Sequence, residues 1–251
     1  MAQETILISD GNGVNFQHRL RCNGDGDDSW DATVTDVNSY RDSVQDGDTN
    51  PSIQRWNNGN SGGGRYITDR NYFSFDMSVI PGDATITAVS VIFTTQTAAR
   101  FITDADSEVF RLVKGTDTLD GVTAPNGTTT ANAIDHTVNN GADVNGSSSD
   151  LTDITFDLGS SGLYDWVVSQ HAAGEGAHMY LLTKLEYDTF VDETWGEPSG
   201  TNYSGWTGIA YATTNKRPRI VVDYTPGPPP PFNKLKVNAG QLKINAGTLV
   251  I

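Results

Sequence analysis

The sequence predicts an all-β protein: a jelly-roll-like antiparallel β-sandwich with one short helix, followed by a proline-rich linker and a short β-repeat tail. Short alternating or apolar runs recur along the chain, and clusters of Gly, Asn, Asp and Ser separate them. Four consecutive prolines then precede a seven-residue repeat. The length of 251 residues allows a sizeable core. We expect a sandwich domain at 1–226, a linker at 227–233 and a tail at 234–251.

The expected strands share β-branched or aromatic residues in short runs between turn residues. They are Thr5–Ser9, Tyr72–Asp76, Thr85–Thr94, Glu108–Lys114, Asp153–Asp157, His178–Leu185, Gly208–Ala212 and Arg219–Tyr224. Within Tyr72–Asp76, alternation places Phe73 and Phe75 on one face of the strand. In contrast, segments 23–64 and 116–150 are rich in Gly, Asn, Thr and Ser, and we expect both to be long loops.

One helix is expected after residue 160. Ser160 or Ser161 can cap its first turn, and Gly174 can end it. Helical spacing places Leu163, Trp166, Val167 and Gln170 on one face. We expect Trp166 to anchor this helix in the core, across one end of the sandwich.

The end of the chain carries its only clear internal repeat. The units Leu235–Gln241 and Leu242–Thr248 are nearly identical, and Leu249–Ile251 begins a third. The four prolines before them favour an extended, stiff spacer. A tail this short cannot bury its own apolar side chains, so we expect it to dock on a partner or on copies of itself. The residues expected to make that contact are Leu235, Val237, Leu242, Ile244, Leu249 and Ile251.

The chain is strongly acidic, and this excludes several classes of partner. Sixteen basic residues stand against 31 acidic ones, giving a net charge of −15. Such a surface repels nucleic acid and anionic membranes. Cys22 is the single cysteine, so no internal disulfide can form. The first residues lack the basic and apolar regions of a secretory signal, and no apolar run has membrane-spanning length.

Three segments resemble one known family. They are Tyr72–Ile92, with its aromatic-Asp strand and Ile-Pro corner; Thr155–Leu158 with the following helix and Ala177–Leu182; and Ala210–Thr225. Their order is similar to that of the DNRLRE-type, carbohydrate-binding-module-like β-sandwich of bacterial surface proteins and phage virion proteins. The resemblance implies a sandwich over most of residues 5–226. It implies no catalytic or binding residue, because the family has no single fixed motif.

Signals for catalysis are poor. Gly59–Gly63 matches the nucleophile-elbow pattern, but no strand-like run precedes it and no helix-like run follows it. The four histidines, at 18, 136, 171 and 178, lack the spacing of metal ligands. Carboxylates are so abundant that their proximity in sequence singles out no acid–base pair. We therefore expect a protein that is not an enzyme.

Calcium is the one inorganic cofactor that the sequence suggests. Two acidic loops alternate short oxygen-bearing side chains, as calcium loops do. The candidate ligands are Asp25, Asp27, Asp31, Asp46, Asp48 and Asn50. Pro51 and Asn57 stand where an EF-hand requires Gly and Glu, so only an irregular site remains. The alternative is ordinary turn chemistry, which uses the same residues.

Sugar binding is suggested by aromatic residues in polar, loop-like surroundings. Exposed rings can stack on sugar faces while amides and carboxylates meet the hydroxyls. The candidates are Trp30, Trp56, Trp195, Tyr203 and Trp206. The alternative is that these rings cover the ends of the sandwich or lie in a subunit interface.

Three functions follow as hypotheses. The first is a non-enzymatic phage virion protein, a capsid-decoration or tail-associated subunit anchored or oligomerised through its C-terminal tail. It would be made in the host cytoplasm, and its partners would be other virion proteins, copies of itself and surface glycans. The second is a glycan-binding module of a surface or adhesion protein. The third is a glycan-cleaving enzyme that uses the Asp-rich loops.

Overall fold

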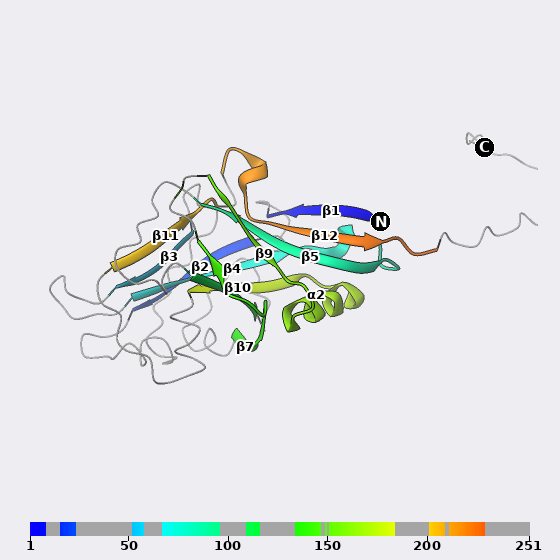
Figure 1. Cartoon of the computed structure of the whole chain (residues 1–251), viewed down its shortest axis with the longest axis horizontal. Coiled ribbons are helices and arrows are strands. Elements are labelled where there is room, and N and C mark those ends of the chain that lie inside the picture. The colour runs from blue at the N-terminus through cyan, green and yellow to red at the C-terminus, as the bar shows by residue number, and fades with distance from the viewer. Residues whose placement is uncertain are drawn as a thin grey trace, which may run out of the picture.

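A computed structural model shows two antiparallel β-sheets with one short α-helix, as Figure 1 illustrates. It describes residues 1–8, 16–23, 52–57, 67–95, 109–115, 134–146, 149, 151–183, 201–208 and 211–228. The expected all-β sandwich is confirmed. The linker is described only at residues 227 and 228, and the tail at 234–251 lies outside the described residues.

The smaller sheet has four strands in the order β1-β12-β5-β9. Its strands are β1 (Ala2–Leu7), β12 (Arg219–Thr225), β5 (Thr85–Thr94) and β9 (Asp153–Asp157). The larger sheet has the order β11-β3-β4-β10-β6-β7, with β2 paired to β4 and β8 paired to β6. Its strands are β2 (Phe16–Asn23), β3 (Ser52–Asn57), β4 (Ile67–Phe75), β6 (Val109–Gly115), β7 (Ile134–Asn139), β8 (Val144–Asn145), β10 (Ala177–Thr183) and β11 (Thr201–Trp206).

Aromatic rings fill the core between the sheets. Phe93 of β5 lies at its centre, with its ring centroid 4.6 Å from that of Phe73 and 5.6 Å from that of Phe156. Trp206 approaches Phe93 and Phe110 edge-on, at 5.8 and 5.1 Å. Tilted and edge-to-face pairs are the favoured geometries for such rings. These contacts join β4, β6 and β11 of the larger sheet to β5 and β9 of the smaller one.

Strand β4 is buried on both faces. Phe73 and Phe75 belong to the core, as expected from alternation. Tyr72 and Ser74 alternate with them and are also fully buried. On the β10 side, Tyr72 lies directly opposite Tyr180, with ring centroids 4.9 Å apart. A second buried layer therefore lies on the outer face of the larger sheet.

Strand β5 carries a bulge that changes which side chains it buries. Asp223 of β12 pairs with Ala88, but the next residue, Tyr224, pairs with Ile86. Thr87 is therefore the extra residue, and its hydroxyl donates to the Asp223 carbonyl oxygen at 3.1 Å. Because a bulge shifts the alternation by one position, the buried set changes from Ile86 to Val89, Val91 and Phe93.

The helix α2 (Gly162–Ala173) begins and ends where the sequence predicts. The Ser161 hydroxyl accepts from the Tyr164 amide at 3.3 Å, and Gly174 ends the helix in the left-handed conformation. The buried stripe is Leu163, Val167 and His171, at spacing i, i+4, i+8. Trp166, expected to anchor the helix, packs against the core but is only partly buried, because it lies about 100° around the helix from Val167; the buried stripe is the anchor instead.

Three other expectations need correction. The segment 23–64 contains β3, and 116–150 contains β7 and β8, so neither is wholly loop. These strands, and also β2, were missed because their sequences are mainly polar and lack an apolar alternation. The strand predicted at Gly208–Ala212 is absent at its described residues. The strand lies earlier, at β11, and is followed by the 3-10 turn η4 (Thr214–Lys216).

Candidate functional site: a polar cluster where the two sheets meet

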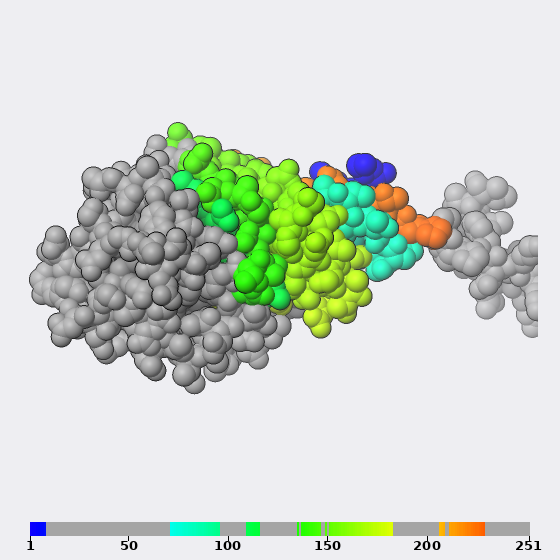
Figure 2. Space-filling view, turned by 60° about the horizontal axis from the view of Figure 1, so that its bottom comes forward, coloured from blue at the N-terminus to red at the C-terminus, as the bar shows by residue number. Residues whose placement is uncertain are grey.

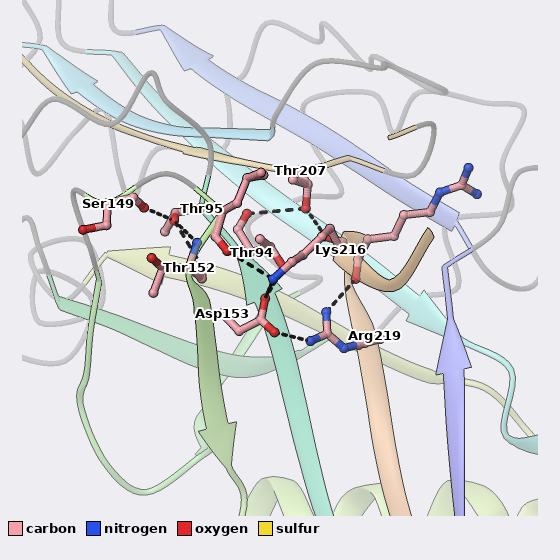
Figure 3. A network of polar contacts seen from close by, with 10 residues as sticks. Thr94, Thr95, Ser149, Thr152, Asp153, Thr207, Lys216 and Arg219 are labelled. Atoms are coloured by element: carbon pink, nitrogen blue, oxygen red, sulfur yellow. Dashed lines mark hydrogen bonds and ion pairs between the residues drawn. The ribbon is translucent and has the colours of Figure 1, made fainter. Parts of the chain in front are cut away.

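Charged and hydroxyl side chains gather where several strands of the sandwich begin or end (Figure 3). Asp153 is the first residue of β9 and lies opposite Thr94, the last residue of β5. Arg219 is the first residue of β12, and Lys216 ends η4 just before it. The antiparallel order β12-β5-β9 brings these four positions to one end of the smaller sheet.

The Asp153 carboxylate is the centre of the cluster. Thr94 Oγ1 donates to it at 2.7 Å, Lys216 Nζ at 3.1 Å and Arg219 Nη2 at 2.7 Å. Partial burial pushes the pKa of Asp153 upward, but the hydrogen bonds from Thr94 and Lys216 and the charge of Arg219 outweigh it. The pKa therefore lies below its ordinary value of 3.8, and the carboxylate stays ionised at neutral pH.

Two threonines, Thr95 and Thr207, connect this cluster to the larger sheet. Thr95 forms an isolated β-bridge with Trp206, and the Thr207 amide donates to the Thr94 carbonyl oxygen at 2.9 Å. The Thr207 hydroxyl also donates to the Lys216 carbonyl oxygen. As a result, the end of β5 is bonded to β9 on one side and to the segment after β11 on the other.

Leu151 shows that this end of the molecule constrains the backbone. It is the non-glycine residue with a positive φ, 52°, among the described residues. Its amide donates to the Thr95 carbonyl oxygen at 2.8 Å, and its carbonyl oxygen accepts from Lys216 Nζ at 3.1 Å. Since the left-handed conformation is unfavourable for a leucine, these bonds hold the chain in a turn that its own preference opposes.

The contacts of this cluster indicate a structural role. An ionised carboxylate that accepts from a lysine, an arginine and a threonine at once is held in place and is not poised to exchange a proton. All three donors come from segments distant in sequence. The arrangement therefore stabilises the closure of the sandwich.

His178 is the other titratable group that the fold perturbs. It lies on β10, and its ring stacks on Tyr72 with centroids 5.9 Å apart. Only 8% of the residue is exposed, and desolvation lowers its pKa from 6.5 to about 4. Gly115 leaves room for this pair, because a Cβ there would lie 3.1 Å from the Tyr72 ring. The imidazole is therefore neutral at physiological pH and packed into the second buried layer.

The structure overturns one of the five predicted sugar-binding residues. Trp206 is fully buried in the core between Phe93 and Phe110, so it offers no face to a sugar. Its polar neighbours in sequence suggested a loop, but it ends a strand whose last residue points inward. Trp56 lies on β3 and Tyr203 on the adjacent β11, and their register places positions 56 and 203 on opposite faces of the sheet. Trp30 and Trp195 lie outside the described residues.

The six predicted calcium ligands, Asp25, Asp27, Asp31, Asp46, Asp48 and Asn50, all lie outside the described residues, as does the glycine loop at 59–63. Within the described ranges, no group of three or more His, Cys, Asp or Glu side chains is placed to share a metal ion. No helix in the described part of the chain has the length and apolar character needed to cross a bilayer.

Comparison with known proteins adds no relative. No family model matches the chain, and no curated protein is significantly similar to it. The comparisons thus give no support to the resemblance to the DNRLRE-type sandwich.

Proposed function

We propose that the protein is a non-enzymatic structural subunit of a phage virion, a decoration or tail-associated protein that assembles through its C-terminal tail. The observation that carries this proposal is the way in which the chain leaves the sandwich. The last described strand of the sandwich is β12, and the sequence continues with a proline-rich segment and then an apolar repeat.

The exit from the sandwich has a fixed position. A Cβ on Gly227 would collide with the Asp83 carboxylate and lie 2.7 Å from its backbone oxygen, so the chain passes close against the turn at Pro81–Ala84. Figure 2 shows this exit at one extremity of the described surface, where the orange residues meet the cyan ones. Consecutive prolines favour an extended chain, which would carry the repeat away from the sandwich.

The described part of the sandwich supports the proposal because it has an extensive core of its own. Among the described residues, the hydrophobic core cluster extends from Ile6 to Val222 and draws on both sheets. Residues 1–228 should therefore fold without the repeat. The apolar side chains of the tail are then available for contacts between molecules, as strand addition requires.

The test compares the mass in solution of the full chain with that of residues 1–228, by light scattering. We expect an oligomer for the full chain and a folded monomer for the shortened one. Circular dichroism checks that both are folded. If the full chain and residues 1–228 form particles with the same number of chains, assembly through the tail is contradicted. Binding of surface glycans by the monomer would then favour the alternative, a glycan-binding module that uses Trp30, Trp56, Trp195 or Tyr203.

A further inference from the structure

The edge of the smaller sheet at β1 has a row of backbone groups directed away from the sheet. Strand β1 pairs with β12 on one side, and no described strand lies on the other; in Figure 1 it runs along the rim of the molecule. The Ile8 amide donates to the Pro218 carbonyl oxygen opposite it, at 3.1 Å. Hydrogen-bonded pairs alternate along an antiparallel ladder, so the backbone groups of Gln3, Thr5 and Leu7 point away from β12.

This edge lacks most of the features that usually prevent strands from pairing. Protected edges carry proline, lysine, bulges or inward-pointing charges. The six residues of β1 include no proline and no lysine, and their register with β12 is regular. Glu4 is their single charged residue; it is half-buried and lies on the same face of the strand as Ile6. The opposite edge of the same sheet, β9, is one residue shorter, and its first residue, Asp153, is already engaged by Thr94, Lys216 and Arg219. Of the two edges, β1 is the one suited to receive another strand.

We propose that the β1 edge is the docking site for the C-terminal tail, residues 234–251, of a second copy of this chain. The inference rests on the proposed function and names the surface that the tail occupies. Each repeat begins with four alternating residues, Leu235–Asn238 and Leu242–Asn245, and each run is short enough to pair along β1. The Asn-Ala-Gly steps that follow suit turns.

The direction of the exit favours a neighbour's tail over the chain's own. Since β12 is antiparallel to β1, a tail that turned back onto its own β1 would run parallel to β1. Every pair in the described sheets is antiparallel. The chain would also have to reverse its direction within Pro226–Pro231, and the five prolines of this segment favour an extended chain. Gly227, within the same segment, lies close against Asp83, which leaves little space for a turn there. A tail from a second copy requires neither the reversal nor the parallel pairing.

Charge supports the same pairing. The last 23 residues contain three lysines and no acid, whereas the other 228 residues contain 13 basic and 31 acidic side chains. Asp223 of β12 lies opposite Gln3 on the exposed face of the sheet, and its carboxylate accepts from Gln3 Nε2 at 2.8 Å. Glu4 of β1 is a second acidic residue near this edge, on the opposite face. Lys236 and Lys243 sit inside the alternating runs. They would meet an acidic surface when the tail pairs with β1.

The test is Thr5→Pro in the full chain, with Thr155→Pro as the matched control. Both threonines are exposed and occupy edge strands of the same sheet. The Leu158 amide bonds to the Val89 carbonyl oxygen opposite it, so by the same alternation Thr155 directs its amide away from β5. Each proline thus removes an outward donor without removing a hydrogen bond within the sheet. We expect Thr5→Pro to raise the concentration at which half of the chains assemble by about tenfold or more, and Thr155→Pro to leave it unchanged.

Amide hydrogen exchange provides a second readout on the unmodified protein. The amides of Gln3, Thr5 and Leu7 should exchange about tenfold more slowly in the full chain than in residues 1–228. A tail-dependent oligomer with unprotected amides and no response to Thr5→Pro would overturn the docking site but leave tail-mediated assembly standing. A monomeric full chain with protected amides would assign the edge to the chain's own tail. A monomer without protection would overturn both proposals.

Discussion

At the scale of single residues, the clearest effect of the fold is on His178. Its ring is buried against Tyr72, where no described group offers Nδ1 a hydrogen bond. A charged imidazole is unfavourable there, so burial lowers the pKa to about 4. The neighbouring Tyr72 and Tyr180 form part of the same buried layer, which explains how a histidine serves as a packing residue.

This pKa predicts a dependence of stability on pH. The unfolded chain binds the proton at about pH 6.5 and the folded chain only near pH 4, so protonation favours unfolding between these values. The contribution of neutral His178 is complete above about pH 6.5 and declines as the pH falls towards 4. Lowering the pH from about 7.5 to about 5 should cost roughly 2 kcal/mol through this residue. In urea unfolding, the His178→Phe variant should lose correspondingly less free energy of unfolding over this pH range than the unmodified protein. If both proteins lose stability equally as the pH falls, the pH dependence does not come from His178.

At the scale of elements, capping residues near in sequence determine where the helix α2 begins and ends, whereas tertiary contacts determine which of its faces is buried. The Ser161 cap and Gly174, with φ of 73°, are visible in the sequence. Tyr164 donates from its hydroxyl to the Ile86 carbonyl oxygen, and His171 Nε2 donates to that of Pro81. Both partners lie at the start of β5 or in the turn before it. These contacts orient the helix so that Trp166 lies at the flank of the core.

Gly174→Ala should destabilise the protein by about 1 kcal/mol, because a Cβ disfavours the left-handed backbone even though nothing lies within 4 Å of it. Gly82→Ala is the matched control, since it also has open space but no positive φ. We expect its effect to stay within about 0.5 kcal/mol. Thermal or urea unfolding measures both. Equal effects of the two substitutions would show that backbone strain is not the cause.

At the scale of the whole molecule, two kinds of contact close the sandwich. Aromatic packing around Phe93 joins the sheets through the core, and the Asp153 cluster fastens one end of it. The two meet at Trp206 and Thr207, neighbours in sequence that contribute to the core and to the cluster respectively. Because these adjacent residues are held in the core and in the cluster, the segment after β11 packs against β5 and does not continue as a separate strand.

Asp153→Asn should lower the free energy of unfolding by about 1–2 kcal/mol, because it removes the charge that Lys216 and Arg219 share. The Asp153 side chain is 37% exposed, which limits the effect through solvent screening. Asp157→Asn, on the same face of β9, is the control and should change little. Urea unfolding at low and high salt should show the gap between Asp153→Asn and the parent protein narrowing as salt increases. A gap that salt leaves unchanged would mean that the ion pairs contribute nothing measurable.

The sequence by itself determined the class of the protein and the features that depend on neighbours in the chain. Alternation located β5 and β9 at their observed bounds, and Ser161 and Gly174 marked the helix, because capping and side-chain alternation act within a few residues. Only the tertiary structure decided that Trp206 is core, that Thr87 shifts the alternation of β5, and that Asp153 meets Lys216 and Arg219. The partners in these contacts are separated by tens of residues or more, so their positions follow from the order and register of strands, which no local pattern specifies.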